Sequence, residues 1–74
     1  MSAKLPLDEV MNYDLRFLSP GAYTAEELQA ELERSQAVIA AHVMAGTGQG
    51  YWFERVREIE RLRAARGPFE KEAR

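Results

Sequence analysis

Two helix-forming stretches separated by only five residues set the strongest limit on how this chain can fold. The separating residues, 46–50, have glycine at alternate positions, and the sequence on both sides favours helix. So short a connection allows only a close reversal, so the two helices should pack antiparallel. The sequence therefore predicts an all-α hairpin, with helices at residues 24–45 and 51–66 and a glycine-rich turn at 46–50.

A capping box marks the start of the first helix. Thr24 is followed three residues later by Glu27, and in this motif each side chain satisfies a backbone N–H of the first turn. Tyr23, just before the cap, is spaced to contact Leu28 in the arrangement called a hydrophobic staple. These four residues predict a well-defined helix start.

Glycines mark the ends of both helices. Gly46 follows the last helix-favouring residue of the first helix and suits the left-handed conformation that terminates many helices. Gly67 and Pro68 end the second helix near Arg66. Beyond them, residues 67–74 are expected to form a frayed tail.

The N-terminal segment, residues 1–19, carries weaker signals. Pro6 followed by two acidic residues fits a short helix over residues 5–13. Leu15, Phe17 and Leu18 then continue as an extended apolar piece. We expect the segment to cover one end of the hairpin or to cross to a second subunit.

The chain is short for a self-sufficient core. It has 74 residues and no cysteine, so neither disulfides nor cysteine zinc sites can add stability. Each predicted helix carries an apolar stripe that a lone hairpin leaves exposed. We therefore expect a homodimer in a four-helix arrangement, with the N-terminal segments packed across it. The predicted dimer interface is Leu28, Leu32, Ile39, His42, Trp52, Val56 and Ile59.

The glycine spacing raises the alternative of a phosphate-binding loop, which its context does not support. G-x-G-x-G matches neither the dinucleotide-binding motif nor the Walker motif, and both of those follow a β-strand. No lysine occurs between Lys4 and Lys71. We interpret the glycines as a turn and expect no cofactor.

No group of residues fits catalysis or metal binding. His42 is the only histidine, and its neighbours at helical spacing are apolar residues or glycine. Metal ligation and acid–base catalysis need further polar groups nearby, so we predict a core or interface histidine. Two adjacent acid pairs, at residues 8–9 and 26–27, stand where first-turn acids favour the helix dipole. The sequence thus predicts no enzyme and no metal site.

The net charge of -2 hides an uneven distribution. Residues 1–50 carry seven acids and three bases, whereas residues 51–74 carry five acids and seven bases. In the hairpin, the acidic start of the first helix should lie nearest the basic end of the second, in exposed pairs that contribute ~0–1 kcal/mol each. Five arginines in residues 55–66 make DNA or RNA binding the alternative function, although interleaved glutamates weaken the positive potential.

Three consecutive aromatic residues follow the turn. On a helix, Tyr51, Trp52 and Phe53 spread over about 200° and cannot all enter one core. Aromatic residues with arginines dominate many protein interfaces. We therefore expect a non-enzymatic protein-binding module, a regulator, adaptor or inhibitor that occludes or bridges a partner, similar in size and character to phage-encoded inhibitors. The predicted partner-binding residues are Tyr51, Phe53, Arg55, Arg57 and Arg61.

The sequence also carries an expectation about location. No apolar run reaches the roughly 20 residues that span a bilayer, and residues 1–6 lack the apolar region of a secretory signal. We expect no membrane contact and a cytoplasmic location.

Overall fold

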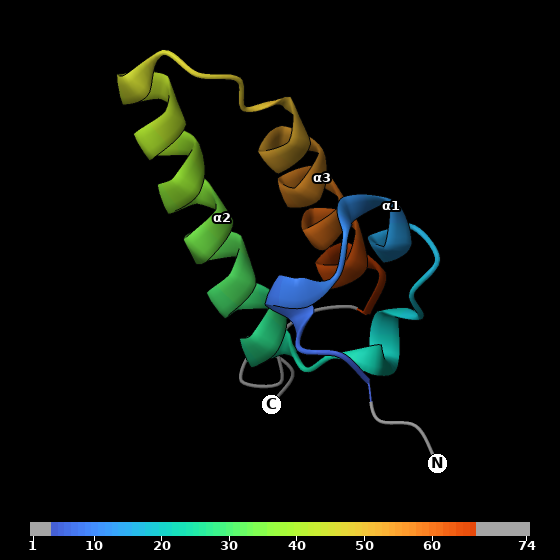
Figure 1. Cartoon of the computed structure of the whole chain (residues 1–74). Helices are drawn as coiled ribbons and strands as arrows, with labels where there is room; N and C mark the ends of the chain where they lie inside the picture. Colours follow the sequence, from blue (N-terminus) through green and yellow to red (C-terminus); the bar gives the residue numbers. More distant parts are fainter. Residues whose placement is uncertain (1–3, 67–74) are drawn as a thin grey trace.

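The computed structural model describes residues 4–66 and shows an antiparallel helical hairpin with a folded N-terminal segment against its open end (Figure 1). The hairpin consists of α2 (Ala25–Ala45) and α3 (Gly50–Arg66). In the structure the N-terminal segment extends over residues 4–23 and contains η1 (Leu7–Glu9), α1 (Asn12–Leu15) and η2 (Pro20–Ala22). The all-α prediction is confirmed for the described residues, which contain no strand. The predicted tail, residues 67–74, lies outside them.

The start of α2 has the predicted capping box. The backbone N–H of Glu27 donates to Thr24 Oγ1 over 3.0 Å, and the backbone N–H of Thr24 donates to Glu27 Oε1 over 2.7 Å. Tyr23 and Leu28 are both buried and belong to one apolar cluster. The helix start is therefore specified locally and is also anchored in the core.

The turn between the two long helices closes with a Schellman motif. Gly46 has a φ of 72°, the left-handed value predicted for it. Its N–H donates to the carbonyl of Val43, and the N–H of Thr47 donates to the carbonyl of His42, at 3.2 and 3.0 Å. This pair of hydrogen bonds satisfies carbonyls that the end of a helix otherwise leaves unpaired. The interpretation of the glycines as a helix-ending turn is confirmed.

The N-terminal segment differs from its prediction. A single short helix was expected over residues 5–13, but Val10 is extended, with φ -85° and ψ 129°, and separates η1 from α1. Leu15 ends α1, so its placement in an extended piece is wrong. The bends have a packing reason, because Leu7, Val10 and Leu15 are all buried in the same cluster. One straight helix could not turn all three toward it.

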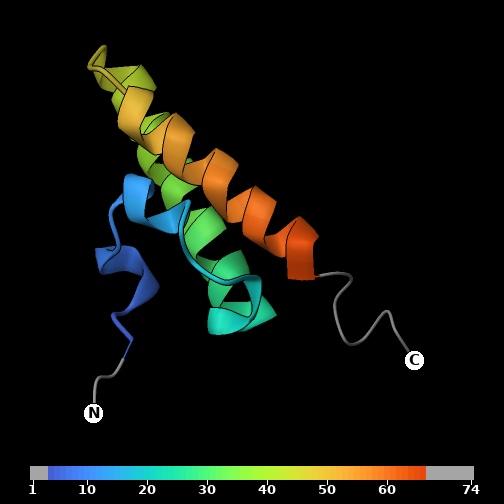
Figure 2. The same cartoon turned by 90° about the vertical axis from the view of Figure 1, so that its right-hand side faces the viewer.

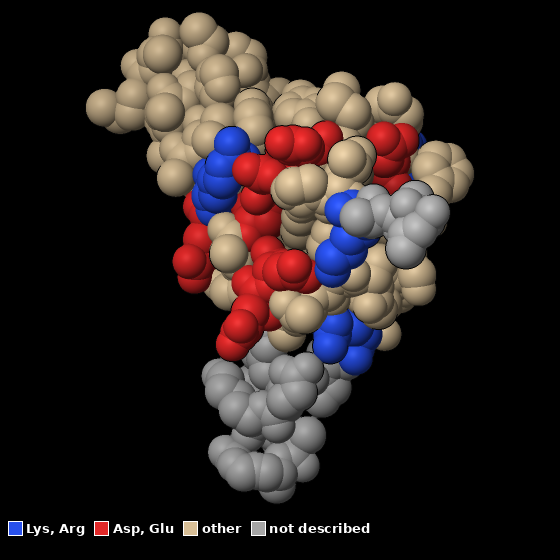
Figure 3. Space-filling view, turned by 60° about the horizontal axis from the view of Figure 1, so that its bottom comes forward, with Lys and Arg blue, Asp and Glu red and all other residues tan. Residues whose placement is uncertain are grey.

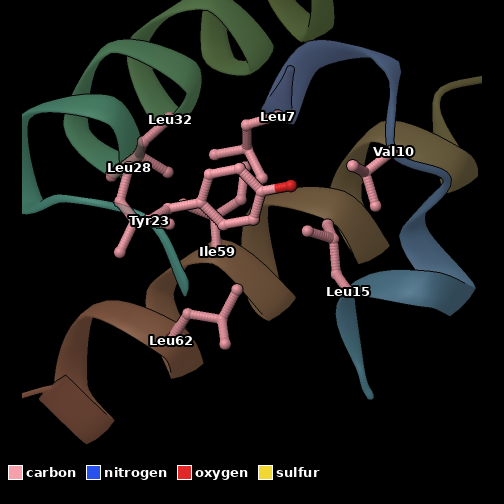
Figure 4. Packing of buried hydrophobic residues seen from close by; sticks show 8 residues of the cluster. All are labelled: Leu7, Val10, Leu15, Tyr23, Leu28, Leu32, Ile59 and Leu62. Carbon is pink, nitrogen blue, oxygen red and sulfur yellow. The ribbon is translucent and has the colours of Figure 1, made fainter. Parts of the chain in front are cut away.

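The apolar core lies at the open end of the hairpin. Figure 4 shows side chains from the N-terminal segment, α2 and α3 meeting there. The cluster consists of Leu7, Val10, Leu15, Tyr23, Leu28, Leu32, Ile59 and Leu62. Half of it comes from the N-terminal segment, which covers one end of the hairpin, the first of the two alternatives expected.

The molecule is flat and elongated. Its extents are 42 × 33 × 15 Å and its radius of gyration is 13.2 Å, against about 11 Å for a compact domain of this length. Figure 2 shows why, since the hairpin extends well past the N-terminal segment at its closed end. We call residues 35–53 the tip and the remaining described residues the base.

Candidate interaction surface

The tip has no charged side chain. From Ser35 to Phe53 there is no Asp, Glu, Lys or Arg, in a chain of which 30% is charged. In Figure 3 the lobe at the upper left is neutral throughout, whereas acidic and basic side chains gather over the rest of that face. The hairpin therefore presents one uncharged, projecting end.

Large apolar side chains are exposed on this end. Met44 is 89% exposed, Val43 55%, Phe53 50% and Tyr51 38%. Phe53 and Tyr51 were predicted as partner-binding residues, and the structure places both at the surface of the tip. Exposed apolar groups gathered without charges are typical of a contact surface.

A half-buried apolar stripe runs between the exposed residues. It continues the buried positions of the base along both helices, with the same spacing of three and four residues. Its members are Val38, Ile39 and His42 on α2 and Trp52 and Val56, just below the tip boundary, on α3. The N-terminal segment covers the base but does not bury these side chains.

The structure divides the predicted dimer interface into two groups. Leu28, Leu32 and Ile59 are at most 5% exposed and lie in the core of a single chain. Assigning these three to an interface is wrong for this conformation, because the N-terminal segment already covers them. Ile39, His42 and Trp52 are half-buried and stay within the candidate surface, whereas Val56 is half-buried and packs against the core of the base.

Aromatic and polar contacts hold the tip in shape. The rings of Tyr51 and Trp52 meet edge to face, with centroids 5.1 Å apart and planes at 86°. His42 Nδ1 lies 2.6 Å from Thr47 Oγ1, which links the last turn of α2 to the loop.

Arg55 is the largest fully buried side chain of the base, and it holds the N-terminal segment. Its guanidinium donates to the carbonyl oxygens of Leu7 and Val10, on either side of the extended break. Both Nε and Nη2 lie 3.3 Å from Glu31 Oε2, on α2. The side chain of Arg55 thus joins the N-terminal segment, α2 and α3. The prediction that Arg55 contacts a partner is wrong, since its exposed fraction is 0%.

Other arginines of α3 hold the same segment. Arg61 Nη2 donates to the carbonyl of Leu15 over 2.8 Å, and Arg66 donates to the carbonyl of Tyr23. The Leu15 carbonyl also accepts from the backbone N–H of Leu18 over 3.2 Å, so Arg61 uses its second acceptor position. Arg57 is the most exposed, at 75% of its side chain, and lies 3.9 Å from Glu54.

The charge pairing between the helices includes a buried pair that was not predicted. Glu31 of α2 pairs with Arg55 of α3, whereas Arg57 and Arg61 pair with Glu54 and Glu58 of their own helix. At the start of α2, the pKa of Glu27 is lowered, mainly because the backbone N–H of Thr24 donates to its carboxylate and also because Lys4 lies 3.2 Å away.

Two features of the structure could have been found in the sequence: the buried position of Arg55 and the uncharged tip. Arg55 is spaced three residues after Trp52 and four before Ile59, which places it on the apolar stripe of α3. The neutral run from Ser35 to Phe53 is also present in the sequence, and it crosses the boundary at residue 50 between the acidic and the basic part of the chain. The first signal is a charged residue on an apolar stripe, and the second is a long run of residues without charge.

Among residues 4–66, no helix is both long and apolar enough to cross a membrane. The same residues contain no group of three or more acidic or histidine side chains that could hold a metal ion. Comparison of the chain with protein-family models, with curated proteins and with solved structures finds no match.

Proposed function

We propose that this chain is a non-enzymatic protein-binding module whose contact surface is the tip. One observation carries the proposal: the hairpin projects beyond its core as an end with no charged residue and with exposed apolar side chains. Monomeric proteins rarely expose such patches without a binding role. The module acts by covering or bridging its partner, as an adaptor or inhibitor does.

The residue types at the tip support a protein partner. Tyr51 and Phe53 offer large rigid rings, and such rings are enriched among the residues that dominate binding energy. Met44 adds a flexible side chain that adapts to irregular apolar surfaces. Because Tyr51 also packs against Trp52, its ring is ordered before binding and loses little entropy there.

The arginines of α3 favour this proposal over nucleic-acid binding. Arg55, Arg61 and Arg66 donate to backbone carbonyls of the N-terminal segment, so they contribute to the fold. Phosphate binding depends on summed exposed positive charge, and the tip carries none. Binding by the proposed surface should therefore depend weakly on salt.

A capture experiment with matched phenylalanine variants tests the proposal. Phe53 at the tip and Phe17 on the base are both exposed, at 50% and 84%. Immobilised wild-type protein and Phe17→Ala should retain the same protein from a native lysate. The amount retained by Phe53→Ala should be at least tenfold smaller, which corresponds to a loss of ~1.4 kcal/mol in binding free energy.

The salt dependence of capture separates the two functions. Retention that is unchanged by raising the salt from about 0.1 to about 0.5 M fits an apolar surface, and retention that collapses with salt fits nucleic acid. Equal capture by both phenylalanine variants would contradict a role for the tip. Circular dichroism of each variant confirms that the fold is retained.

A further inference from the structure

The apolar stripe of the hairpin is longer than the cover that the chain provides for it. We propose that the protein bound by the tip is a second copy of this chain, and that two tips pack around a twofold axis as a four-helix arrangement. This inference rests on the proposed function, because it names the occupant of the same surface.

Continuity of the stripe supports this occupant. On α2, Leu28, Leu32 and Ser35 are buried, while Ile39 and His42, next in the same spacing, are only half-buried. The change occurs where the N-terminal segment ends its cover. A surface that continues a core in the same residue pattern needs a cover of similar length and polarity. The tip of a second copy has both, because it carries the same stripe.

The charge distribution distinguishes a second copy from a different protein. Around a twofold axis each residue near the axis meets its own copy, so any charged side chain there faces the same charge. The tip avoids this repulsion because residues 35–53 carry no charge. A surface for a different protein has no such restriction and commonly uses complementary charges to select its partner. Complete neutrality over the whole tip therefore favours self-pairing.

Several polar groups of the turn are already paired within one chain. The carbonyls of His42 and Val43 accept hydrogen bonds from the N–H groups of Thr47 and Gly46. The ring of His42 is bonded to the hydroxyl of Thr47. Since these groups are paired inside one chain, covering them with a second tip leaves them satisfied and avoids the cost of an unpaired buried polar atom.

The size of the tip sets the expected strength of the dimer. The part of α2 in the tip is about 16 Å long at ~1.5 Å per residue, and two neighbouring helices are about 20 Å wide. A face of these dimensions is smaller than the ~800 Å² per partner of standard interfaces. We therefore expect a reversible dimer with a dissociation constant in the micromolar range, on the order of -8 kcal/mol or weaker.

Sedimentation equilibrium with paired glutamate variants tests this proposal. Over about 10 µM to 1 mM, a range that brackets such affinities, the wild-type mass should rise from 8.4 kDa toward twice that value. Val43→Glu places a charge on the stripe side of α2 and should raise the dissociation constant at least tenfold, so that its mass rises only at higher concentrations than that of the wild type. Ala37→Glu places the same charge on the opposite, exposed face of α2 and should associate like the wild type.

A charge-complementation experiment tests the twofold arrangement. Val43→Lys alone should weaken association to the same extent, and an equimolar mixture of Val43→Lys with Val43→Glu should recover it if the two copies of Val43 face each other across the axis. Because Val43 is 55% exposed, both variants are expected to keep the fold, which circular dichroism checks.

The outcomes separate this inference from the proposed function. A wild-type chain that stays monomeric to about 1 mM overturns the second copy, and so does a Val43→Glu variant that dimerises normally. A mixture that fails to associate overturns a twofold axis that brings the two copies of Val43 together. If self-association is absent but Phe53→Ala still loses a captured protein that Phe17→Ala retains, the tip binds a different protein. If both self-association and selective capture are absent, the proposed function fails as well.

Discussion

The base and the tip are built from the same two helices but differ in almost every physical respect. In the base, α2 and α3 enclose a core of eight buried apolar residues with help from the N-terminal segment. Charged side chains cover its surface, and one ion pair lies inside it. In the tip, none of residues 36–53 is buried and none is charged. The base resembles a small folded domain, and the tip resembles one side of an interface.

This difference separates the source of stability from the site of contact. Burial of apolar surface is the main favourable term in folding, so the base provides most of the stability of the chain. The tip keeps its shape through helix continuation from the base and through the hydrogen bonds of its turn. Substitutions in the base should therefore act on folding, and substitutions in the tip should act on binding.

The largest expected effect is the loss of Arg55. Arg55→Ala removes the buried guanidinium partner of Glu31, which keeps only the half-exposed Arg34 at 3.1 Å, and removes the donors to two carbonyls. Breaking a buried pair costs about 3–5 kcal/mol; because the Arg34 contact remains, we expect a loss near the lower end, about 3 kcal/mol, which is a large part of the stability expected for a domain this small. Chemical denaturation monitored by circular dichroism measures the free energy of unfolding.

Two further variants make the Arg55 prediction specific. Arg57→Ala removes an exposed arginine two residues away and should change stability by no more than about 0.5 kcal/mol. The double variant Arg55→Met with Glu31→Leu removes both charges and should be more stable than Arg55→Ala. If Arg55→Ala and Arg57→Ala are equally stable, the buried pair does not hold the base together.

Two isoleucines compare the halves directly. Ile59 is fully buried in the base, and Ile39 is half-buried in the tip. Ile59→Ala should destabilise the monomer by about 2–4 kcal/mol through lost burial and a cavity, and Ile39→Ala by less than half of that. Thermal unfolding at low micromolar concentration compares the monomers, and similar losses at both positions would remove the distinction between the two halves.

Two glycines of the turn give a smaller effect. Gly46 is left-handed, so Gly46→Ala should cost about 1 kcal/mol. Gly48 is not left-handed and an added Cβ meets no atom within 4 Å, so Gly48→Ala should be neutral or stabilising by up to about 0.5 kcal/mol. Urea midpoints of the two variants test this order. Equal costs at both glycines would mean that the Schellman motif is not what requires glycine at position 46.

The smallest effect concerns pH at the start of α2. The pKa of Glu27 lies below its ordinary value of 4.5 in the folded chain. A lowered pKa means that the carboxylate contributes stability above its unfolded pKa and loses it as the pH falls through the folded pKa. The difference in melting temperature between the wild type and Glu27→Gln should therefore be present at pH 7 and shrink below about pH 4. A difference that is constant with pH would contradict the assignment.

Sequence reasoning succeeded where structure depends on neighbouring residues. The capping box at Thr24 and the left-handed glycine at position 46 were both predictable because their hydrogen bonds join residues three to five positions apart. The antiparallel hairpin followed from the shortness of the turn. The exposure of Tyr51 and Phe53 also followed from their helical spacing.

The path of the N-terminal segment and the partners of Arg55 were not predictable in the same way. The extended break at Val10 is held by a side chain 45 residues later in the chain, so no local pattern contains it. Arginine in a helix rich in alternating charges is usually solvated, and its burial here depends on Glu31 and on two distant carbonyls. Because the N-terminal segment covers Leu28, Leu32 and Ile59, these residues lie in the core of one chain and not in the interface predicted for them.

The arginine contacts of α3 have a consequence for how this chain tolerates change. Arg55, Arg61 and Arg66 bind carbonyls, which every amino acid has, so the side chains of Leu7, Val10, Leu15 and Tyr23 are not what these arginines recognise. The spacing between those carbonyls is what must match the spacing along α3. The N-terminal segment is therefore constrained in length: at exposed positions it can accept many substitutions, whereas a one-residue insertion between Val10 and Leu15 moves the carbonyls out of register with the arginines.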